Sequence, residues 1–461
     1  MTKTIQCISP IDWSVYAERA CASPEDARAA VMAAKASQKA WAALSISERA
    51  DYVMRAVAYV GDTQPRMVEE LAWQMGRPVR YGGEFGGFNE RASYMAEIAE
   101  DALADMVIED SGAFTRKIKR EAAGTVLVVA PWNYPYMTAI NTIAPALIAG
   151  NTVVLKHASQ TILVGEHLAD AFAHAGLPEG VFTNLVLDHD TTSALIADGL
   201  FACVNFTGSV GGGRAMERAA AGTFTAVATE LGGKDPGYVR ADAGVKAAAE
   251  ALIDGAMFNS GQCCCGIERL YLHDDVYDDF LDIAREIVEG YVLGNPLDTA
   301  TTLGPMAQTR FADLVRSQTQ EALELGAQAL IDPKLFPQDR GAYLMPQILI
   351  RADHHMRVMQ EESFGPVVGI MRVANDEEAI GLMNDSQFGL TCALWTQDAD
   401  AAEAIGARLE TGMVFMNRCD YLDPALCWTG CKDTGRGAGL SALGYHALTR
   451  PKSYHLKKVI S

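Results

Sequence analysis

GTVLVVAPWN at Gly124–Asn133 is a short run of apolar, largely β-branched residues that ends in a polar segment, and NTVVLK at Asn151–Lys156 repeats the pattern. Three further runs of this kind follow: FTNLVL (Phe182–Leu187), ACVNFTGS (Ala202–Ser209) and TAVATELGG (Thr225–Gly233). Segments with helical spacing, such as Thr161–Ala175, separate them. Short apolar strands that alternate with helices predict a parallel sheet, so we expect an α/β fold.

Polar and glycine residues stand where these predicted strands end. They are Pro131–Asn133, Lys156 and Thr207–Ser209. Parallel sheets bind their ligands at the carboxyl ends of the strands. Gly208 and Ser209 also open a glycine-rich turn, which continues through Gly211–Gly213 and whose backbone can approach a pyrophosphate at the start of a helix. The sequence therefore predicts a nucleotide site at this edge of the sheet.

Helical patterns precede this region, and a second mixed region follows it. We expect two helices between Pro24 and about Val60, a third at Met67–Met75, a glycine-rich loop at Gly82–Gly87 and a further helix at Glu90–Leu103. Beyond Gly232, the pattern predicts a helix from Val245 to about Asn259 and a strand at Arg269–Leu272, with more strands and helices up to Gly437.

Composition excludes several classes of protein. The chain has 461 residues, of which 49% are hydrophobic and 21% charged, as in ordinary globular proteins, and its length predicts two or three domains. A net charge of −20 offers no basic field for nucleic acid. No window reaches the roughly 18 apolar residues of a membrane span, and the start MTKTIQCISPIDW lacks the apolar stretch of a signal peptide. We therefore expect a cytoplasmic protein with reduced cysteines and neither nucleic acid nor membrane as a partner.

Three consecutive cysteines, Cys263–Cys265, follow the loop Asn259–Gln262. A thiol becomes a strong nucleophile when its surroundings favour the thiolate, which makes Cys264 a candidate catalyst. Taken alone, a cysteine in a loop is more often a small buried apolar residue. Cys419, Cys427 and Cys431 do not have zinc-site spacing, so we expect no metal.

Seven segments of the chain favour a catalytic role for Cys264. They are PWNYP at Pro131–Pro135, GNTVVLK at Gly150–Lys156, FTGS at Phe206–Ser209, ELGGKDP at Glu230–Pro236, FNSGQCCCGIER at Phe258–Arg269, EESFGPV at Glu361–Val367 and NDSQFGL at Asn384–Leu390. In this order, over nearly the whole chain, they resemble the aldehyde dehydrogenase superfamily of the NAD(P)-dependent, non-acylating type.

The resemblance implies oxidation of an aldehyde to a carboxylic acid with NAD(P)+. Cys264 would attack the aldehyde carbon to give a thiohemiacetal, and loss of hydride would leave a thioester. The side-chain amide of Asn133 and the backbone N–H of Cys264 would stabilise the oxyanion. Glu230 would act as the base that activates water for hydrolysis of the thioester.

The resemblance also assigns coenzyme contacts. They are Trp132, Lys156, Ser159, Gly208, Ser209, Glu362 and Phe364. Many NAD-preferring relatives carry a glutamate at the position of Ser159, where it binds the ribose 2′-hydroxyl. A hydroxyl there admits a 2′-phosphate, so either NAD or NADP is expected.

The carboxyl-terminal segment Cys427–Gly439 departs from the family pattern, because the usual Arg-Glu pair is absent and Gly439 replaces a glutamate that relays protons in some relatives. Aromatic residues at Tyr134, Phe258 and Trp428 match positions that line the aldehyde tunnel, and Asp420 adds a negative charge. Arg418 beside it and Asn141 in the tunnel argue against a dedicated cation site. Amino aldehydes, semialdehyde acids and simple aliphatic or aromatic aldehydes all stay open.

Two alternative functions are compatible with the fold. A CoA-acylating relative would pass the thioester to CoA, but such enzymes commonly lack the equivalent of Glu230. A structural protein of the same fold would be free to lose Cys264, Glu230 or Asn133, and all three are present. The resemblance further implies a Rossmann-like NAD(P)-binding domain (residues 1–103 and 122–231), an α/β catalytic domain (232–446) and a small β oligomerisation extension (104–121 and 447–461). We expect a homodimer or homotetramer.

Overall fold

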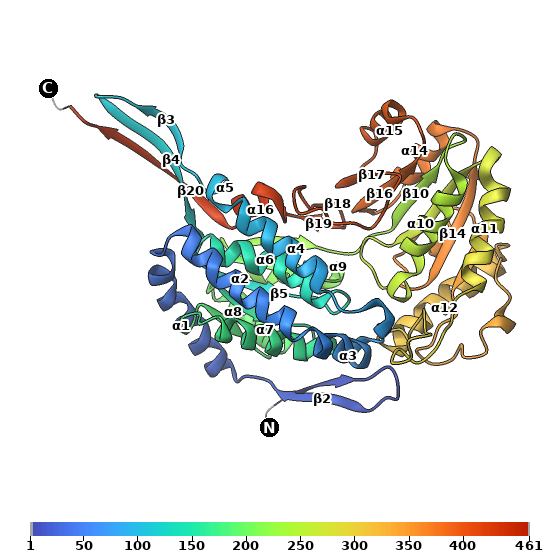
Figure 1. Cartoon of the computed structure of the whole chain (residues 1–461), viewed down its shortest axis with the longest axis horizontal. Coiled ribbons are helices and arrows are strands. Elements are labelled where there is room, and N and C mark those ends of the chain that lie inside the picture. Colours follow the sequence, from blue (N-terminus) through green and yellow to red (C-terminus); the bar gives the residue numbers. More distant parts are fainter. Residues whose placement is uncertain (1–2, 460–461) are drawn as a thin grey trace.

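The five β-branched runs form the parallel strands of a six-stranded sheet in the computed structural model, which describes residues 3–459 (Figure 1). The sheet has the order β19-β9-β8-β5-β6-β7. Its strands are β5 (Thr125–Val129), β6 (Thr152–Lys156), β7 (Phe182–Asn184), β8 (Cys203–Thr207), β9 (Ala226–Glu230) and the antiparallel β19 (Gly435–Arg436). The strand order reverses between β5 and β8, so the crevice at their carboxyl ends is the expected ligand position.

Helices cover both faces of this sheet. One face packs on α2 (Ile46–Asp62), α4 (Phe85–Glu97), α6 (Pro135–Ile148) and α7 (Ile162–His174). The opposite face packs on α1 (Pro24–Ala42), α8 (His189–Ala197) and α9 (Val210–Ala220). All five residues of β5 and of β6 are buried, as expected for strands covered on both sides.

The predicted amino-terminal helices are confirmed as α1, α2 and α3 (Gln64–Met75), but the predicted glycine loop is wrong in part. The structure has a short turn, η1 (Val79–Tyr81), and α4 already begins at Phe85, before α5 (Ala99–Ala102). A Cβ on Gly87 would lie 2.4 Å from the Met137 sulfur of α6. Glycine at this position therefore allows two helices to approach closely and does not mark a loop.

A seven-stranded sheet forms the second half of the molecule, with the order β12-β13-β14-β11-β10-β16-β17. Its strands are β10 (Asp235–Val239), β11 (Ile267–His273), β12 (Gln328–Ala329), β13 (Gln347–Ile350), β14 (Val367–Val373), β16 (Thr391–Trp395) and β17 (Met413–Met416). Its helices are α10 (Val245–Met257), α11 (Tyr277–Glu289), α12 (Thr309–Glu324), α13 (Arg357–Gln360), α14 (Asp376–Asn384) and α15 (Ala399–Gly406), with the short turns η4 (Asp274–Val276) and η5 (Pro333–Leu335). The predicted helix from Val245 ends at Met257, and the predicted strand is β11.

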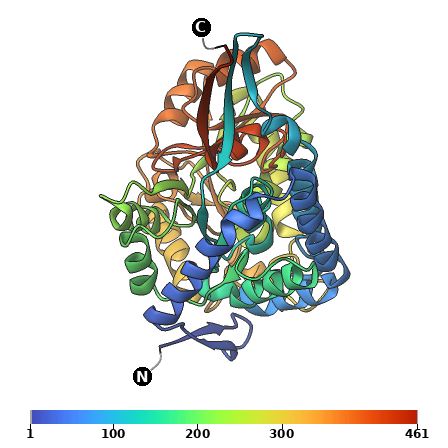
Figure 2. The same cartoon turned by 90° about the vertical axis from the view of Figure 1, so that its left-hand side faces the viewer.

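Three antiparallel strands project from the body as an extension (Figures 1 and 2). They are β3 (Met106–Asp110), β4 (Phe114–Ala122) and β20 (Thr449–Lys457), which follows α16 (Ser441–Ala447). The described residues do not include 460 and 461, which belong to the expected extension. They also do not include 1 and 2, with which the expected NAD(P)-binding domain begins. The hairpin of β1 (Thr4–Ile8) and β2 (Val15–Ala20) lies at the opposite end, and β15 (Phe388–Gly389) pairs with β18 (Cys431–Lys432).

Across residues 3–459, no helix combines the length and the apolar character that crossing a bilayer requires.

Candidate active site

Two cavities meet between the two large sheets. The first has a volume of about 390 Å³ and the second a volume of about 530 Å³. Both are lined by Thr207, Glu230, Leu231 and Cys264. A group bound in one cavity therefore meets a group bound in the other beside a thiol and a carboxylate.

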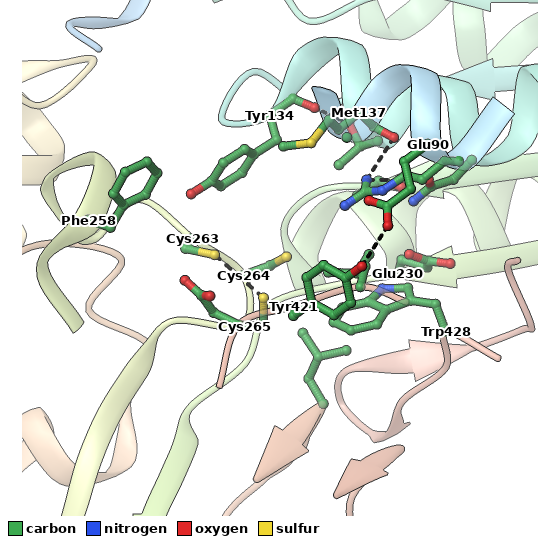
Figure 3. Close-up of a pocket in the computed structure, with 18 of the residues that line it drawn as sticks. Glu90, Tyr134, Met137, Glu230, Phe258, Cys263, Cys264, Cys265, Tyr421 and Trp428 are labelled. Carbon is green, nitrogen blue, oxygen red and sulfur yellow. Dashed lines mark hydrogen bonds between the residues drawn. The ribbon is translucent and has the colours of Figure 1, made fainter. Parts of the chain in front are cut away.

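Cys264 lies between the turn η3 (Phe258–Gly261) and β11, in the middle of the cysteine triplet. Figure 3 shows the triplet between the aromatic side chains of Tyr134 and Phe258 and the side chains of Glu230 and Trp428. Cys263 and Cys265 are buried with their sulfurs 3.5 Å apart, whereas Cys264 is partly exposed. Hydrogen bonding with Cys263, together with burial, raises the pKa of Cys264 well above its usual value. A protonated thiol must lose its proton before it attacks a carbonyl.

Asn133 follows β5 and is buried, with its side chain directed at the loop before the triplet. Its Nδ2 donates to the backbone oxygen of Gln262 at 3.3 Å. An amide has two N–H groups, so this contact leaves one donor for a ligand near Cys264.

Glu230 ends β9 and lines both cavities. Burial raises the pKa of Glu230 to about 7, although the nearby charge of Arg91 and a contact with Trp428 offset part of the rise. A carboxylate that titrates near neutral pH is suited to general-base catalysis. Because Gly439 has no side chain, it leaves space for the carboxyl of Glu230. A Cβ on Gly439 would lie 2.9 Å from Glu230 Oε1.

The larger cavity begins at the amino terminus of α9. Ser209 caps this helix, and its Oγ accepts a hydrogen bond from the Gly212 backbone at 3.2 Å. A Cβ on Gly208 or Gly212 would lie 2.8 or 2.4 Å from the Phe206 ring, so any larger residue at these positions would require the ring to shift. Lys156, at the end of β6, is buried at the same cavity, and burial lowers its pKa. A helix start whose glycine residues leave the backbone accessible, together with a nearby cation, suits a dinucleotide that contains a pyrophosphate.

Aromatic rings and a carboxylate form the other end of this cavity. Trp132 stacks on Phe311 with centroids 5.3 Å apart, and Phe364 meets the Trp132 ring edge-on at 5.6 Å. Glu362 Oε1 accepts a hydrogen bond from the Gly233 backbone at 3.1 Å, and burial raises the pKa of Glu362 to about 8. This geometry can hold a flat ring against the aromatic wall and a ribose hydroxyl at the carboxylate.

The structure does not bring every predicted contact into these cavities. Trp132, Lys156, Gly208, Ser209, Glu362 and Phe364 line the larger cavity, but Ser159 does not. Ser159 begins η2 (Ser159–Thr161), just beyond Ala158, and Ala158 does line the cavity. The predicted aldehyde-pocket residues Tyr134, Phe258, Asp420 and Trp428 all line the smaller cavity.

Sequence reasoning missed several residues that contribute to the site. Arg91 and Tyr421 line the smaller cavity, and Arg310 and Phe311 line the larger one. Of these four residues, only Arg91 stands near a feature that is visible in the sequence, because it follows Gly87 by one helical turn on α4. Within residues 3–459, no group of three or more His, Cys, Asp or Glu side chains is placed to hold a metal ion.

Comparisons with known proteins agree with this geometry. The model of the aldehyde dehydrogenase family matches residues 1–454. An aldehyde dehydrogenase of Paenarthrobacter nicotinovorans is 33% identical, with 94% of this chain and 95% of that protein covered. A succinate-semialdehyde dehydrogenase (NADP+) of Deinococcus radiodurans is 31% identical, with 89% and 86% covered.

Solved structures give the same result. The crystal structure of PnpE in complex with nicotinamide adenine dinucleotide has a TM-score of 0.94 at 29% sequence identity, covering all of this chain and 95% of PnpE. The chain therefore belongs to the aldehyde dehydrogenase family and is an NAD(P)-dependent oxidoreductase acting on the aldehyde group.

Proposed function

We propose that the chain oxidises its aldehyde to a carboxylic acid by covalent catalysis at Cys264. The observation that carries the proposal is the meeting of the two cavities at Cys264 and Glu230. The Cys264 thiol loses its proton to water, and the thiolate then attacks the aldehyde carbon. The free N–H of the Asn133 amide and the backbone N–H of Cys264 donate to the alkoxide, and losing one such donor lowers the rate about 100- to 1,000-fold.

The larger cavity would hold NAD or NADP, which when bound would supply the acceptor for the hydride that leaves the tetrahedral carbon. Lys156, Gly208 and Ser209 bind its adenosine and pyrophosphate end. Trp132, Glu362 and Phe364 place its other end beside Cys264. Ser159 contributes indirectly, because a serine at the turn after Lys156 introduces no carboxylate to repel a 2′-phosphate.

Hydrolysis of the thioester is the task of Glu230. Its carboxylate removes a proton from water as the water attacks the acyl carbon, and the Cys264 thiolate leaves. Because Gly439 supplies no carboxylate next to Glu230, the proton reaches solvent without the glutamate relay of other family members. Transfer of the acyl group to CoA is not favoured, because the relatives named above oxidise aldehydes and Glu230 is present.

The decisive experiment measures absorbance at 340 nm with a panel of aldehydes, NAD and NADP in parallel, in wild type and Cys264→Ala. We expect turnover without CoA in wild type and none in the variant. Wild-type turnover that begins only when CoA is added would refute the hydrolytic role of Glu230.

The smaller cavity supports a preference for aldehydes that carry a cationic end. Besides Glu230, its acidic residues are Glu90, Asp254 and Asp420, and its single cation is Arg91. Burial raises the pKa of Asp420 to about 8, so its carboxyl is charged mainly above that pH, and a bound cation favours the charged form. Four aromatic side chains, Tyr134, Phe258, Tyr421 and Trp428, complete the lining, and aromatic faces attract ammonium groups.

A substrate series of matched length tests this preference: 4-aminobutanal, butanal and succinic semialdehyde. We expect 4-aminobutanal to have the highest kcat/KM. Asp420→Asn should lower that value roughly tenfold, equivalent to about 1.4 kcal/mol, without changing the value for butanal. Asp423→Asn, in the same loop but outside the cavity, is the matched control. Equal loss for both aldehydes would refute a charge-based preference.

The extension supports a homodimer or homotetramer. Its strand β3 exposes Met106, Val107 and Ile108 by 61%, 60% and 57%, and both edges of the three-stranded sheet are unpaired in the described chain. Exposed apolar edge strands are usually covered by another chain. We propose that the extension pairs with a second copy of the chain.

We also propose that residues 1–103 and 122–231 form the coenzyme domain and that residues 232–446 form the catalytic domain. All ten cysteines are free, which supports a reducing compartment, the cytoplasm.

A further inference from the structure

Arg77 and Glu84 form a buried ion pair directly behind the catalytic loops. Their Nη1 and Oε1 atoms lie 2.6 Å apart, and the side chains are 4% and 1% exposed. Neither residue lines either cavity. The pair therefore acts on the reaction only through the segments that it contacts.

The pair joins three segments that meet at Cys264. Arg77 Nη2 donates to the backbone oxygen of Asn133 at 2.5 Å, and its Nε donates to Asn259 Oδ1 at 3.2 Å. Glu84 Oε2 accepts hydrogen bonds from the backbone N–H groups of Tyr136 and Met137, 3.0 and 2.8 Å away, at the start of α6. The pair thus holds the loop after β5, the first turn of α6 and the turn that precedes the cysteines.

The turn before the cysteines needs such support. Asn259 and Ser260 are consecutive non-glycine residues with φ of 54° and 56°, a left-handed conformation that costs energy. The side chain of Asn259 holds this turn from inside. Its Nδ2 lies 3.2 Å from the Gln262 oxygen and 3.4 Å from the Asn133 oxygen. Asn133 Nδ2 donates to the same Gln262 oxygen, so the Asn133 amide and the turn before the cysteines are tied to one network.

We propose that Arg77 and Glu84 are positioning residues that hold the Asn133 amide in the geometry that stabilises the oxyanion, acting through the Asn133 backbone and through Asn259. This inference depends on the oxyanion role of Asn133 in the proposed function. A guanidinium is required because it donates in three directions at once, which a lysine ammonium on a flexible stem does not reproduce.

The experiment compares Arg77→Met and Asn259→Gly with wild type, alone and combined with Asn133→Ala. Asn259→Gly is the safer variant for folding, because glycine adopts a positive φ without strain while the amide contacts are lost. Each single variant should lower kcat/KM for the aldehyde by about 10- to 100-fold, as displaced catalytic groups do. The dissociation constant of the coenzyme should change less than about twofold, because Arg77 and Asn259 do not line its cavity.

The double variants distinguish an effect on the position of Asn133 from a general loss of stability. In the Asn133→Ala background, Arg77→Met and Asn259→Gly should add less than about a twofold loss, because residues that act through one another are not additive. Full additivity, or a folded Arg77→Met enzyme with wild-type kcat/KM while Asn133→Ala is impaired, would overturn the inference. Wild-type activity in Asn133→Ala would instead refute the proposed oxyanion role, and the inference with it.

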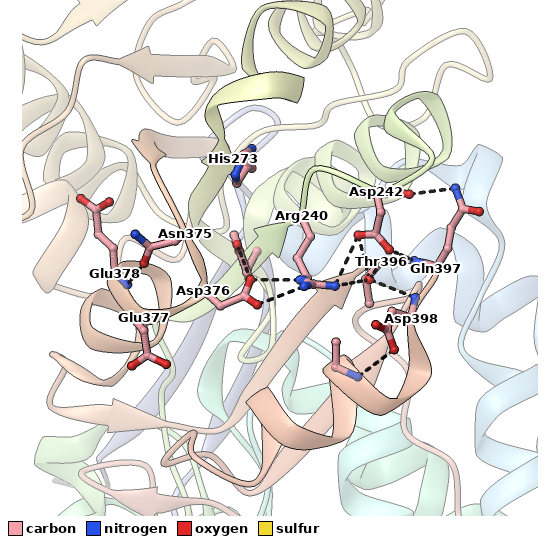
Figure 4. A network of polar contacts seen from close by, with 12 residues as sticks. Arg240, Asp242, His273, Asn375, Asp376, Glu377, Glu378, Thr396, Gln397 and Asp398 are labelled. Carbon is pink, nitrogen blue, oxygen red and sulfur yellow. Dashed lines mark hydrogen bonds and ion pairs between the residues drawn. The ribbon is translucent and has the colours of Figure 1, made fainter.

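A second arginine network gives the matched control (Figure 4). Arg240 bonds both carboxylate oxygens of Asp376 at 3.0 and 3.1 Å, and it also donates to Thr396 at 3.0 Å. This network lines neither active-site cavity. Arg240→Met should therefore lower the melting temperature and leave kcat/KM within about twofold of wild type, because the sites are independent. A loss equal to that of Arg77→Met would mean that any broken ion pair has this effect, and would overturn the inference.

Discussion

The buried carboxyl of Glu230 determines the pH range of the proposed reaction at the scale of single residues. Its pKa is raised to about 7 by burial, so the fraction of ionised base increases as the pH rises through that value. The rate of thioester hydrolysis should therefore increase about tenfold per pH unit below pH 7 and level off above it.

The hydrolysis rate is measured from the steady-state rate after the first turnover, between pH 5.5 and 9. Glu230→Gln should remove the pH dependence along with most of the rate. A wild-type profile without an inflection near 7, or an unchanged inflection in Glu230→Gln, would assign the base to another group.

Residues differ in how far the sequence could predict them. Cys264, Glu230 and Asn133 stand in local motifs, and the structure places all three where the cavities meet or beside that point. Arg77 has no such signal, because its partners Glu84, Asn133 and Asn259 come together only in the folded chain. The resemblance assigns Ser159 to the coenzyme contacts, but the turn η2 places it outside the residues that line the cavity.

At the scale of elements, the turn between β8 and α9 tests how the coenzyme is accommodated. Gly212→Ala places a Cβ 2.4 Å from the Phe206 ring, which itself lines the larger cavity. The ring must shift within the lining of the larger cavity, and we expect the dissociation constant of the coenzyme to rise by roughly tenfold, equivalent to about 1.4 kcal/mol.

Gly211→Ala is the matched control, because a Cβ at Gly211 meets nothing within 4 Å. Titration of coenzyme fluorescence measures both variants. Equal dissociation constants for wild type and Gly212→Ala would show that this turn does not approach the coenzyme.

Element types were more predictable than element ends. Buried parallel strands are continuous β-branched runs, so β5, β6 and β8 were visible in the sequence. The start of α4 was not, because Gly86 and Gly87 suggest a loop unless the close approach of α6 is known. The hairpin β1–β2 is exposed or half-buried over most of its length and has no continuous apolar run, and the two-residue strands β15, β18 and β19 are too short to show a pattern.

At the scale of the whole molecule, the proposed role of the extension in assembly can be tested directly. Ile108 lies in β3 with 57% of its surface exposed, in the sheet that projects from the body. Ile108→Asp places a charge in the proposed subunit contact, where an unpaired charge is unfavourable. We expect the oligomer to dissociate, as measured by light scattering after gel filtration.

Leu325→Asp is the matched control, because Leu325 is 61% exposed just after α12, on the body of the molecule. It should leave the assembly unchanged. A wild-type protein that is monomeric at micromolar concentration would refute the proposed role of the extension.

The domain boundaries also belong to this scale and stay a prediction. The sequence pattern distinguishes the region before Gly232 from the region after it, and two separate sheets occupy these regions. However, β19, from the carboxyl-terminal region, joins the first sheet beside β9. A pairing between residues more than 200 positions apart has no local signal in a single sequence.

The most direct test of covalent catalysis at Cys264 is mass spectrometry of the Glu230→Gln enzyme after one turnover with aldehyde and NAD or NADP. Without the base, thioester hydrolysis slows, and the acyl group should remain attached to the peptide that contains residues 263–265. One equivalent of reduced coenzyme should form, fragmentation should place the mass on Cys264, and Glu230→Gln combined with Cys264→Ala should give neither product. An acyl group on Cys263 or Cys265, or reduced coenzyme without any adduct, would contradict the mechanism.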